Sequence, residues 1–371
     1  MNKTKTIIFS FLIFVLFQYG LLKNAEIMFS KKIDCKKNEM NVIVNEIIEV
    51  KGSIGDSIII ESENIYFFTN NNGFSYYKLN MNEKKELWRF ENDNKNTGIF
   101  KSGIIDGENL YFGSNQGNIY AINLETGISI WNYKNNYSIT STPKIFDEII
   151  YYSDYEGNII GLDSKTGKLM FKEKMKATKC FNSYFIDDNI YLYSNNGMNI
   201  ISYNIVNKKI NWEIINKNYF ISKPIKYKDD LYISSNDCYI YKIRIKDGAM
   251  EKYYFTSDSH VEGILLNSDI LYYSAFNYIF SYSITNKKTL WNVKLDDISW
   301  STLELFDKYI IYDDLMGDFY IIDNKLGNIL FKRKFKSRIT TKKVIDKNNI
   351  IIGTNEGKLY LIKIIENNIN E

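Results

Sequence analysis

Few side chains in this sequence could carry out chemistry, and their types exclude several classes of enzyme. His260 is the single histidine among 371 residues, so Ser-His-Asp or Cys-His machinery could be built around no other residue, and His-rich metal sites are excluded. Cys35, Cys180 and Cys238 are irregularly spaced and form no Cys-x-x-Cys pair, so neither a zinc ribbon nor a redox motif is indicated. We expect free, mostly buried thiols. No GxxxxGK[ST] phosphate loop is present.

A series of residues about 40 positions apart is the best candidate for a binding site. It precedes the first strand of the repeat units described below, and we expect it to surround the mouth of a central channel. Aromatic and imidazole groups there could hold a peptide or a small planar ligand. Packing between neighbouring units is the alternative reading, and we favour it because isolated aromatics are common. The candidates are Phe100, Thr140, Phe220, His260, Trp300 and Thr340, with Cys180 at the same place in its unit.

Carboxylates occur in the turns that we expect on the same face. Clustered oxygens could hold Ca²⁺, but the spacing of an Asp-x-Asp-x-Asp-Gly loop is absent, and we interpret these groups as solvated turn carboxylates. Asp163 and Asp323 are different, because each precedes a tight turn whose amides its side chain could satisfy. We therefore assign no catalytic, cofactor-binding or metal-binding residue. The turn carboxylates are Asp154, Glu156, Asp237, Asp313, Asp314, Asp318 and Glu356.

The elements that position these residues repeat with a period of about 40 residues. A turn recurs at Gly73, Gly117, Gly157, Gly197, Cys238, Asn277, Gly317 and Gly357. An aromatic residue follows each of the first seven turns after 14 or 15 residues, at Trp88, Trp131, Phe171, Trp212, Tyr253, Trp291 and Phe331. Each unit divides into four short runs of β-branched and aromatic residues, which in the third unit are 143–147, 149–153, 158–163 and 168–173. One such sheet cannot bury both faces, so radial stacking of the units predicts a β-propeller.

The predicted fold is therefore all-β, with eight four-stranded antiparallel blades within residues 41–371. The last unit has only three good strands, and we expect the stretch 42–50 to complete it and close the ring. Seven blades plus an odd terminal unit is the alternative. The repeats fall near 54–92, 98–136, 138–176, 178–217, 219–256, 259–296, 299–336 and 338–366.

The first forty residues differ from the rest. Residues 6–22 carry no charge and follow Lys3 and Lys5, which predicts one apolar helix in a signal peptide or signal anchor over 1–24, with a linker over 25–40. An uncleaved anchor is favoured because Lys23 disrupts the best cleavage site, and no lipobox precedes Cys35. Residues 1–37 carry a net charge of +5, which leaves −2 for the rest and argues against a nucleic-acid partner.

Residues 121–131 (AINLETGISIW) resemble the pyrroloquinoline-quinone-type repeat, whose pattern is Ala-x-Asp-x-x-Thr-Gly followed by Trp four residues later. The next unit keeps Asp163, Thr166, Gly167 and Phe171, and the seventh keeps Asp323, Gly327 and Phe331. The likeness covers about residues 54–365. It implies that the aromatic series Trp88, Trp131, Phe171, Trp212, Tyr253, Trp291 and Phe331 docks each blade against its neighbour.

Two branches of this family lead to different functions. Quinoprotein dehydrogenases hold the quinone and a calcium ion, whereas the outer-membrane-assembly propeller lipoprotein is a scaffold without catalysis. This chain lacks the adjacent Cys pair of the dehydrogenases and is shorter than they are. The repeat, the export segment and the scarcity of catalytic groups together predict an exported, membrane-tethered, monomeric scaffold outside the cytoplasm, with no cofactor, that binds an envelope protein or peptide. A dehydrogenase that uses pyrroloquinoline quinone with calcium and a carbohydrate-binding propeller are the alternatives.

Overall fold

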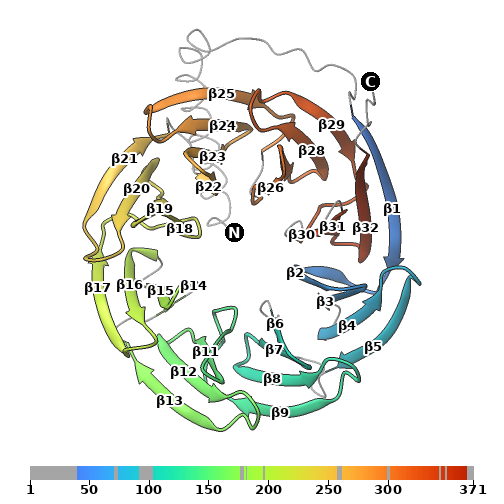
Figure 1. Cartoon of the computed structure of the whole chain (residues 1–371), viewed down its shortest axis with the longest axis vertical. Coiled ribbons are helices and arrows are strands. Elements are labelled where there is room, and N and C mark those ends of the chain that lie inside the picture. The colour runs from blue at the N-terminus through green and yellow to red at the C-terminus, as the bar shows by residue number, and fades with distance from the viewer. Residues whose placement is uncertain are drawn as a thin grey trace, which may run out of the picture. The chain divides into compact units, whose positions relative to one another are not determined.

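The computed structural model describes residues 40–70, 74–91, 103–175, 179–180, 182–194, 197–256, 261–298, 301–341, 344–346 and 349–365. These residues form eight four-stranded antiparallel sheets, and none of them lies in an α-helix. The sheets are blades around a central axis (Figure 1). The predicted all-β, eight-bladed propeller is therefore confirmed, and the seven-bladed alternative is wrong. The predicted N-terminal helix lies outside the described residues.

In the first seven blades the chain runs from an innermost first strand to an outermost fourth strand (Figure 1). Blade 1 contains β2 (Ser53–Glu61), β3 (Asn64–Asn70), β4 (Phe74–Asn80) and β5 (Lys85–Glu91). Blade 2 contains β6 (Ile104–Asp106), β7 (Asn109–Gly113), β8 (Asn118–Asn123) and β9 (Ser129–Lys134). Blade 3 contains β10 (Lys144–Phe146), β11 (Ile149–Ser153), β12 (Asn158–Asp163) and β13 (Leu169–Lys174). Blade 4 contains β14 (Asn182–Ile186), β15 (Asn189–Ser194), β16 (Asn199–Asn204) and β17 (Lys209–Ile215).

The remaining blades follow the same plan except for the last. Blade 5 contains β18 (Ile225–Tyr227), β19 (Asp230–Ser234), β20 (Tyr239–Arg244) and β21 (Met250–Phe255). Blade 6 contains β22 (Val261–Asn267), β23 (Ile270–Ala275), β24 (Tyr278–Ser283) and β25 (Lys288–Lys294). Blade 7 contains β26 (Glu304–Phe306), β27 (Tyr309–Asp313), β28 (Asp318–Asp323) and β29 (Ile329–Lys334). Blade 8 contains β30 (Val344–Asp346), β31 (Asn349–Gly353), β32 (Lys358–Ile365) and, as its outermost strand, β1 (Asn41–Glu49).

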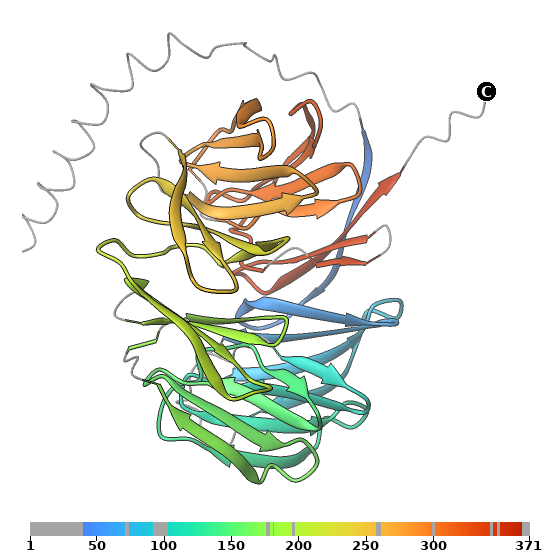
Figure 2. The ribbon, with the colours of Figure 1, turned by 60° about the vertical axis from the view of Figure 1, so that its left-hand side comes forward.

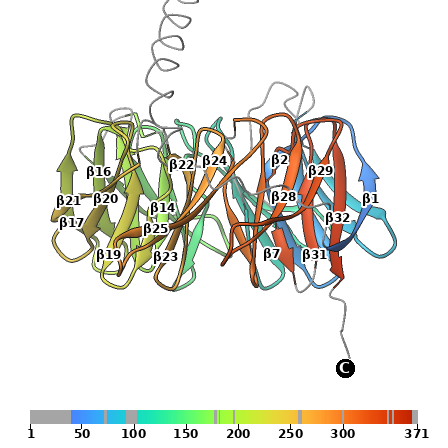
Figure 3. The same ribbon diagram turned by 90° about the horizontal axis from the view of Figure 1, so that it is seen from above.

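The second and third strands of a blade are buried on both faces, whereas the fourth is not. In blade 3, β11 (IIYYS) and β12 (NIIGLD) are buried almost throughout, while β13 (LMFKEK) alternates between half-buried and exposed positions. Twisted sheets of neighbouring blades lie face to face (Figure 2), which explains the continuous apolar runs of the inner strands. Seen from the edge, the strands run between the two faces of the ring (Figure 3).

The hydrophobic core lies at the seams between blades rather than at one centre. Tyr111 and Ile160 belong to the cluster between blades 2 and 3, and each is at most 2% exposed. Phe67 and Ile351 belong to the cluster between blades 1 and 8, so this seam is packed like the others. Each blade therefore depends on both neighbours to bury its apolar faces.

The ring is closed by the N-terminal strand. β1 pairs with β32 in antiparallel register from Asn41 opposite Ile365 to Glu49 opposite Lys358, with an irregularity between Glu46 and Ile48. Without β1, the edge of β32 would expose a row of unpaired backbone groups.

A ring on the outer strand of one blade contacts a turn of the next. The indole Nε1 of Trp131 donates to the carbonyl of Ser164 at 2.9 Å, and the Tyr111 hydroxyl donates to the same oxygen at 3.2 Å. The same geometry recurs at Trp88 with Leu124 (3.0 Å), Trp212 with Ile245 (2.7 Å), Tyr253 with Ile284 (2.9 Å) and Trp291 with Asn324 (3.1 Å). Phe171 and Phe331 have no donor atom and pack into the seams after blades 3 and 7. The aromatic series thus lies where the family pattern implies.

The size of each docking aromatic side chain correlates with the type of residue that ends the turn beneath it. Each of the four tryptophans in this aromatic series covers a turn that ends in glycine, and a Cβ added there would lie 2.6 to 2.7 Å from the indole. Phe171 instead faces a turn that ends in Lys208, whose Nζ lies 5.0 Å from the ring centroid. The turn beneath Tyr253 likewise ends in a lysine, Lys287, with a positive φ of 52°. An indole therefore occupies the space that a Cβ would need.

Replacing a glycine that lies beneath a docking tryptophan should overpack the interface between the two blades. We expect Gly167→Lys to lower the free energy of unfolding by about 3 kcal/mol, because the new Cβ meets the indole of Trp131 and the φ of +69° is unfavourable for lysine. Adding Trp131→Phe should recover about 1 kcal/mol of this loss, since it reproduces the Phe171–Lys208 pair. Urea unfolding of the two single variants and the double variant measures this coupling.

Gly107→Lys is the matched control, because Gly107 has a φ of +56° but nothing within 4 Å of the position of a Cβ. We expect it to cost only about 1 kcal/mol, the penalty of the backbone conformation alone. Equal losses for Gly107→Lys and Gly167→Lys, or strict additivity in the double variant, would show that the indole does not fill the space next to Gly167.

Candidate functional site

One face of the ring carries both the loops between blades and the turns that join second and third strands. Isolated bridges join the two at Ile139 with Asp154, Phe220 with Ser235 and Ile339 with Thr354. We call this side the turn face. The described members of the 40-residue candidate series and the turn carboxylates lie in or next to these segments.

The predicted channel-mouth residues are only partly described. Phe100, His260 and Trp300 lie outside the described residues. Thr140 is 8% exposed, and its hydroxyl lies 3.2 Å from that of Ser153. Thr340 is half-buried and donates to the carbonyl of Ile54 in blade 1 at 2.7 Å. The Thr140 hydroxyl therefore contacts a strand of its own blade, and the Thr340 hydroxyl joins blade 8 to blade 1.

Phe220 does not fit the interpretation of an open channel mouth. It is 4% exposed and packs edge-on against Tyr241, with ring centroids 5.9 Å apart, in the core between blades 4 and 5. Its bridge partner shows that it takes the place of Ile139 and Ile339 rather than that of Thr140. Phe220 is therefore one residue out of register with Thr140 in the repeat. This shift places its ring between blades 4 and 5.

Four of the turn carboxylates are buried, so their interpretation as solvated groups is wrong. Asp154, Asp313, Asp314 and Asp318 are at most 4% exposed. Their oxygens accept hydrogen bonds from nearby N–H and O–H groups or pair with lysines, which offsets the loss of hydration. Of the other members, Glu156 and Asp237 are half-buried and Glu356 is exposed.

Blade 3 shows the fully satisfied form of this arrangement. Asp154 Oδ1 accepts the backbone N–H groups of Glu156 and Asn158 at 3.0 and 2.9 Å. The Asn158 amide donates to both carboxylate oxygens, at 3.0 and 2.7 Å, and the Asn135 amide donates to Oδ2 at 2.9 Å. Asn135 comes from the loop that follows blade 2, so the buried carboxylate fixes one blade to the next.

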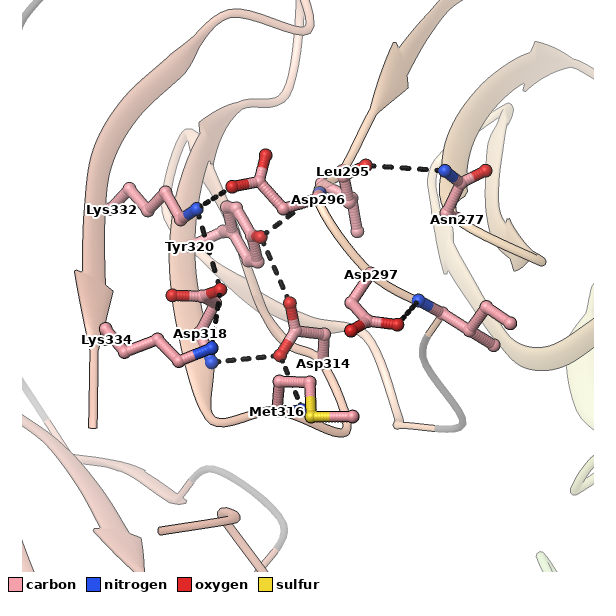
Figure 4. A network of polar contacts seen from close by, with 11 residues as sticks. Asn277, Leu295, Asp296, Asp297, Asp314, Met316, Asp318, Tyr320, Lys332 and Lys334 are labelled. Atoms are coloured by element: carbon pink, nitrogen blue, oxygen red, sulfur yellow. Dashed lines mark hydrogen bonds and ion pairs between the residues drawn. The ribbon is translucent and has the colours of Figure 1, made fainter. Parts of the chain in front are cut away.

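Blade 7 has a second carboxylate where blade 3 has the asparagine (Figure 4). Asp314 takes the place of Asp154 and accepts two N–H groups of its own turn, both at 2.9 Å. Its other oxygen accepts the hydroxyl of Tyr320 at 3.1 Å. Asp318 takes the place of Asn158 and has no amide to offer, so two buried carboxylates lie close together.

Lysines balance part of this charge. Lys334 and Lys332 place their Nζ atoms 3.3 and 3.6 Å from Asp318 Oδ2, and Lys332 also contacts Asp296. The other oxygen of Asp318 is buried and has no hydrogen-bond partner in the described part of the chain. Burial and the negative charge of Asp318 raise the pKa of Asp314.

The two carboxylates predicted to satisfy tight turns do so. Asp163 accepts the N–H and the hydroxyl of Thr166 at 2.8 and 2.6 Å, and these bonds hold the pKa of Asp163 below its usual value. Asp323 accepts the N–H groups of Lys325 and Leu326 at 2.9 and 2.6 Å.

The described residues contain no group of three or more His, Cys, Asp or Glu side chains that could hold a metal ion. Most of the buried carboxylate oxygens already accept donors from the protein. The described turn face therefore does not fit the oxygen cluster of a calcium–quinone site, and we derive no chemistry through such a group.

Sequence reasoning missed two exposed apolar side chains at the tips of neighbouring turns. Phe276 of blade 6 is 46% exposed, and Met316 of blade 7 is 56% exposed. The corresponding tips carry Gln116, Glu156, Asp237 and Glu356 in four other blades, so alignment of the repeats could have revealed them. We call Phe276 and Met316 the tip pair.

Both members of the tip pair belong to turns that hold the same interblade loop. Next to Phe276, the carbonyl of Asn277 accepts the N–H of Leu295 at 2.7 Å. Next to Met316, the N–H of Leu315 donates to the carbonyl of Ile298 at 3.3 Å. Figure 4 shows Asn277, Leu295 and Met316 in one view of this region. The tip pair thus flanks the loop from Leu295 to Ile298.

The eight four-stranded blades define the class of the fold as a β-propeller, which agrees with the fold that the resemblance to the pyrroloquinoline-quinone-type repeat implied. The family described as outer membrane protein assembly factor BamB matches residues 77–180. The search of curated proteins finds no match.

Three solved structures are similar to the chain over most of its length. The computationally designed Ika8 protein has a TM-score of 0.71 at 14% identity and covers 85% of this chain and 98% of its own. BamB from Moraxella catarrhalis has a TM-score of 0.67 at 14% identity and covers 88% and 99%. Sqt1 from Saccharomyces cerevisiae has a TM-score of 0.68 at 11% identity and covers 89% and 100%. At these identities the likeness shows the fold alone.

No helix among the described residues is long and apolar enough to span a membrane. The predicted signal or anchor segment at residues 6–22 lies outside the described residues.

The carboxylate pair of blade 7 makes stability depend on pH. Because the pKa of Asp314 in the folded protein is raised above its unfolded value of about 4, the folded state binds more protons just above that pH. Stability from this group therefore increases as the pH falls from 7 towards 4. Asp318→Asn should restore the blade 3 arrangement, raise the free energy of unfolding at pH 7 by about 1 kcal/mol and reduce this pH dependence.

The reverse change in blade 3 is the matched control. We expect Asn158→Asp to lower the free energy of unfolding by about 2 kcal/mol at pH 7 and by less at pH 4, because it places a second carboxylate beside Asp154. Urea unfolding at pH 4 and pH 7 measures both variants. Loss of stability at pH 7 in Asp318→Asn would mean that the ion pairs of Lys332 and Lys334 outweigh the repulsion.

Proposed function

We propose that this chain is a non-catalytic scaffold that binds a partner protein through the tip pair on its turn face. The observation that carries the proposal is Phe276, which combines an exposed aromatic ring with a backbone φ of +56°. A bulky residue in the left-handed region costs about 1 kcal/mol, and glycine or asparagine is usual in such a turn. Neither burial nor backbone preference accounts for a phenylalanine here, whereas contact with a partner does.

Met316 supports the same surface. Its flexible side chain adapts to the shape of an apolar partner, and it is exposed where four other blades carry polar tips. The carboxylates and lysines around Asp296 supply a polar margin, as binding surfaces commonly have around an apolar centre. The partner should therefore present a small apolar patch with polar groups at its edge.

The proposal includes a location outside the cytoplasm. The basic start and apolar run of residues 6–22 support export with membrane tethering. The match of residues 77–180 to the outer membrane protein assembly factor BamB supports an envelope protein or peptide as the partner. The propeller acts as a monomer in this scheme.

Photo-cross-linking in cells tests the binding surface. We expect benzoylphenylalanine at position 276 and at position 316 to form an adduct with the same single polypeptide, because the two tips flank one loop. Position 116 and position 156 are matched controls at the corresponding tips of blades 2 and 3. Equal adducts from all four positions, or none from 276 and 316, would overturn the proposed surface.

The backbone strain at Phe276 gives an independent prediction. Phe276→Asn should raise the free energy of unfolding by up to about 1 kcal/mol, because asparagine tolerates positive φ. The same variant should lose the adduct formed from position 316. A variant that is less stable than the wild type would show that the ring packs on the protein itself.

A further inference from the structure

A groove on the outer wall between blades 7 and 8 concentrates positive charge. It has a volume of about 410 Å³ and is bordered by β29 and the residues after it on one side and by β1 and β32 on the other. Four cations line it, Arg333, Lys334, Lys336 and Lys358, against the single carboxylate of Glu46. The residues after position 37 carry a net charge of −2, so this concentration of cations stands out from the rest of the propeller.

Two of the four cations are already paired. Lys358 lies 3.1 Å from Glu46 and 3.2 Å from Glu49, and Lys334 lies 3.3 Å from Asp318. Arg333 and Lys336 form no ion pair within the described part of the chain, and both are exposed. These two side chains therefore supply the charge that an anionic ligand would meet.

Aromatic rings form the floor of the groove and hold the guanidinium in place. Phe335 and Tyr360 lie with ring centroids 4.8 Å apart, and the Arg333 guanidinium lies 5.4 Å from the Phe335 centroid. A guanidinium over a ring is attracted to its face and keeps its N–H groups available for a carboxylate. Tyr360 is only half-buried, so an apolar side chain of a ligand has a surface to contact.

The borders of the groove favour an extended peptide over a membrane. β29 and β1 are each the last strand of their sheets, so their outer edges offer backbone groups for pairing with an added strand. A bilayer offers no such backbone. The carboxylates of Glu46, Glu49 and Asp318 lie among the cations and would repel a uniformly anionic surface, whereas a peptide can place its acids at chosen positions.

We propose that this groove binds an extended acidic peptide segment of a partner protein, with Arg333 and Lys336 as the residues that pair with its carboxylates. The groove shares no residue with the tip pair, although the N–H of Phe335 donates to the carbonyl of Gly317, next to Met316, at 2.8 Å. The inference rests on charge and not on the exposed apolar tips, so it stands whether or not the proposed function is correct. It assigns the chain a second point of attachment with a different chemistry, charged rather than apolar.

Fluorescence anisotropy with a labelled decapeptide of alternating Glu and Gly tests the groove. We expect binding at low salt that weakens as salt rises, and no binding of the same peptide with Gln in place of Glu. Arg333→Gln combined with Lys336→Gln should weaken binding about fivefold or more, since two charge contacts are removed. Phe276→Asn should leave this binding unchanged, which separates a failure here from a failure of the tip pair.

The control variant removes the same charge elsewhere. Lys168→Gln combined with Lys288→Gln changes two exposed lysines on blades 3 and 6 and should leave the affinity for the peptide unchanged. Equal weakening by both double variants would reduce the effect to net charge and overturn the proposal. Binding to vesicles of anionic lipid that depends on Arg333 and Lys336, without peptide binding, would assign the groove to a membrane instead. Displacement of the peptide by equimolar inorganic phosphate would reduce it to a simple anion site.

Discussion

The contact of each outer-strand ring with the turn of the next blade is the interaction on which the ring of blades depends. A four-stranded sheet has two apolar faces and cannot bury them alone, so its neighbours must be held at a fixed distance and angle. The indole of Trp131 buries a large apolar area between the two blades. Its N–H also donates to the carbonyl of Ser164 at 2.9 Å, which fixes the orientation of the ring. Gly167 leaves room for that ring. Where Lys208 replaces the glycine, the smaller ring of Phe171 occupies the seam.

This interaction also explains why the fold could be predicted from the sequence. Turn residues and docking aromatics must recur at a fixed spacing for blades of equal size, and that period is visible without a structure. Strand bounds were close as well, with 158–163 predicted and β12 found at Asn158–Asp163. The fourth strand of this unit was predicted at 168–173 and begins one residue later, next to an irregularity at Gly161 and Leu162. Hydrogen bonding across the sheet, which periodicity does not report, sets that last boundary.

The candidate site was far less accessible to sequence reasoning, because its properties arise between blades. Asp154 is buried by a loop from the preceding blade, and no local pattern reports that cover. Phe220 moved into a seam through a register shift of one residue. Nothing in the local sequence distinguishes Phe276 from other aromatic residues. Its positive φ together with its exposed ring identifies it as a candidate binding residue. Comparison of equivalent tips among the repeats is the one sequence signal that could have revealed it.

The closing strand has a mechanical consequence. Asn41 at the start of β1 lies opposite Ile365 at the end of β32, so the chain enters β1 and leaves β32 at the same end of one pair of strands. A force that pulls Asn41 and Ile365 apart breaks the hydrogen bonds between β1 and β32 one pair at a time, instead of loading all of them together in shear. The pairing of β1 with β32 also comes late in synthesis, because Glu46 and Lys358 are 312 residues apart in the chain. Until β32 has been synthesised, β1 has no strand to pair with, and its backbone N–H and C=O groups stay available for pairing with another chain.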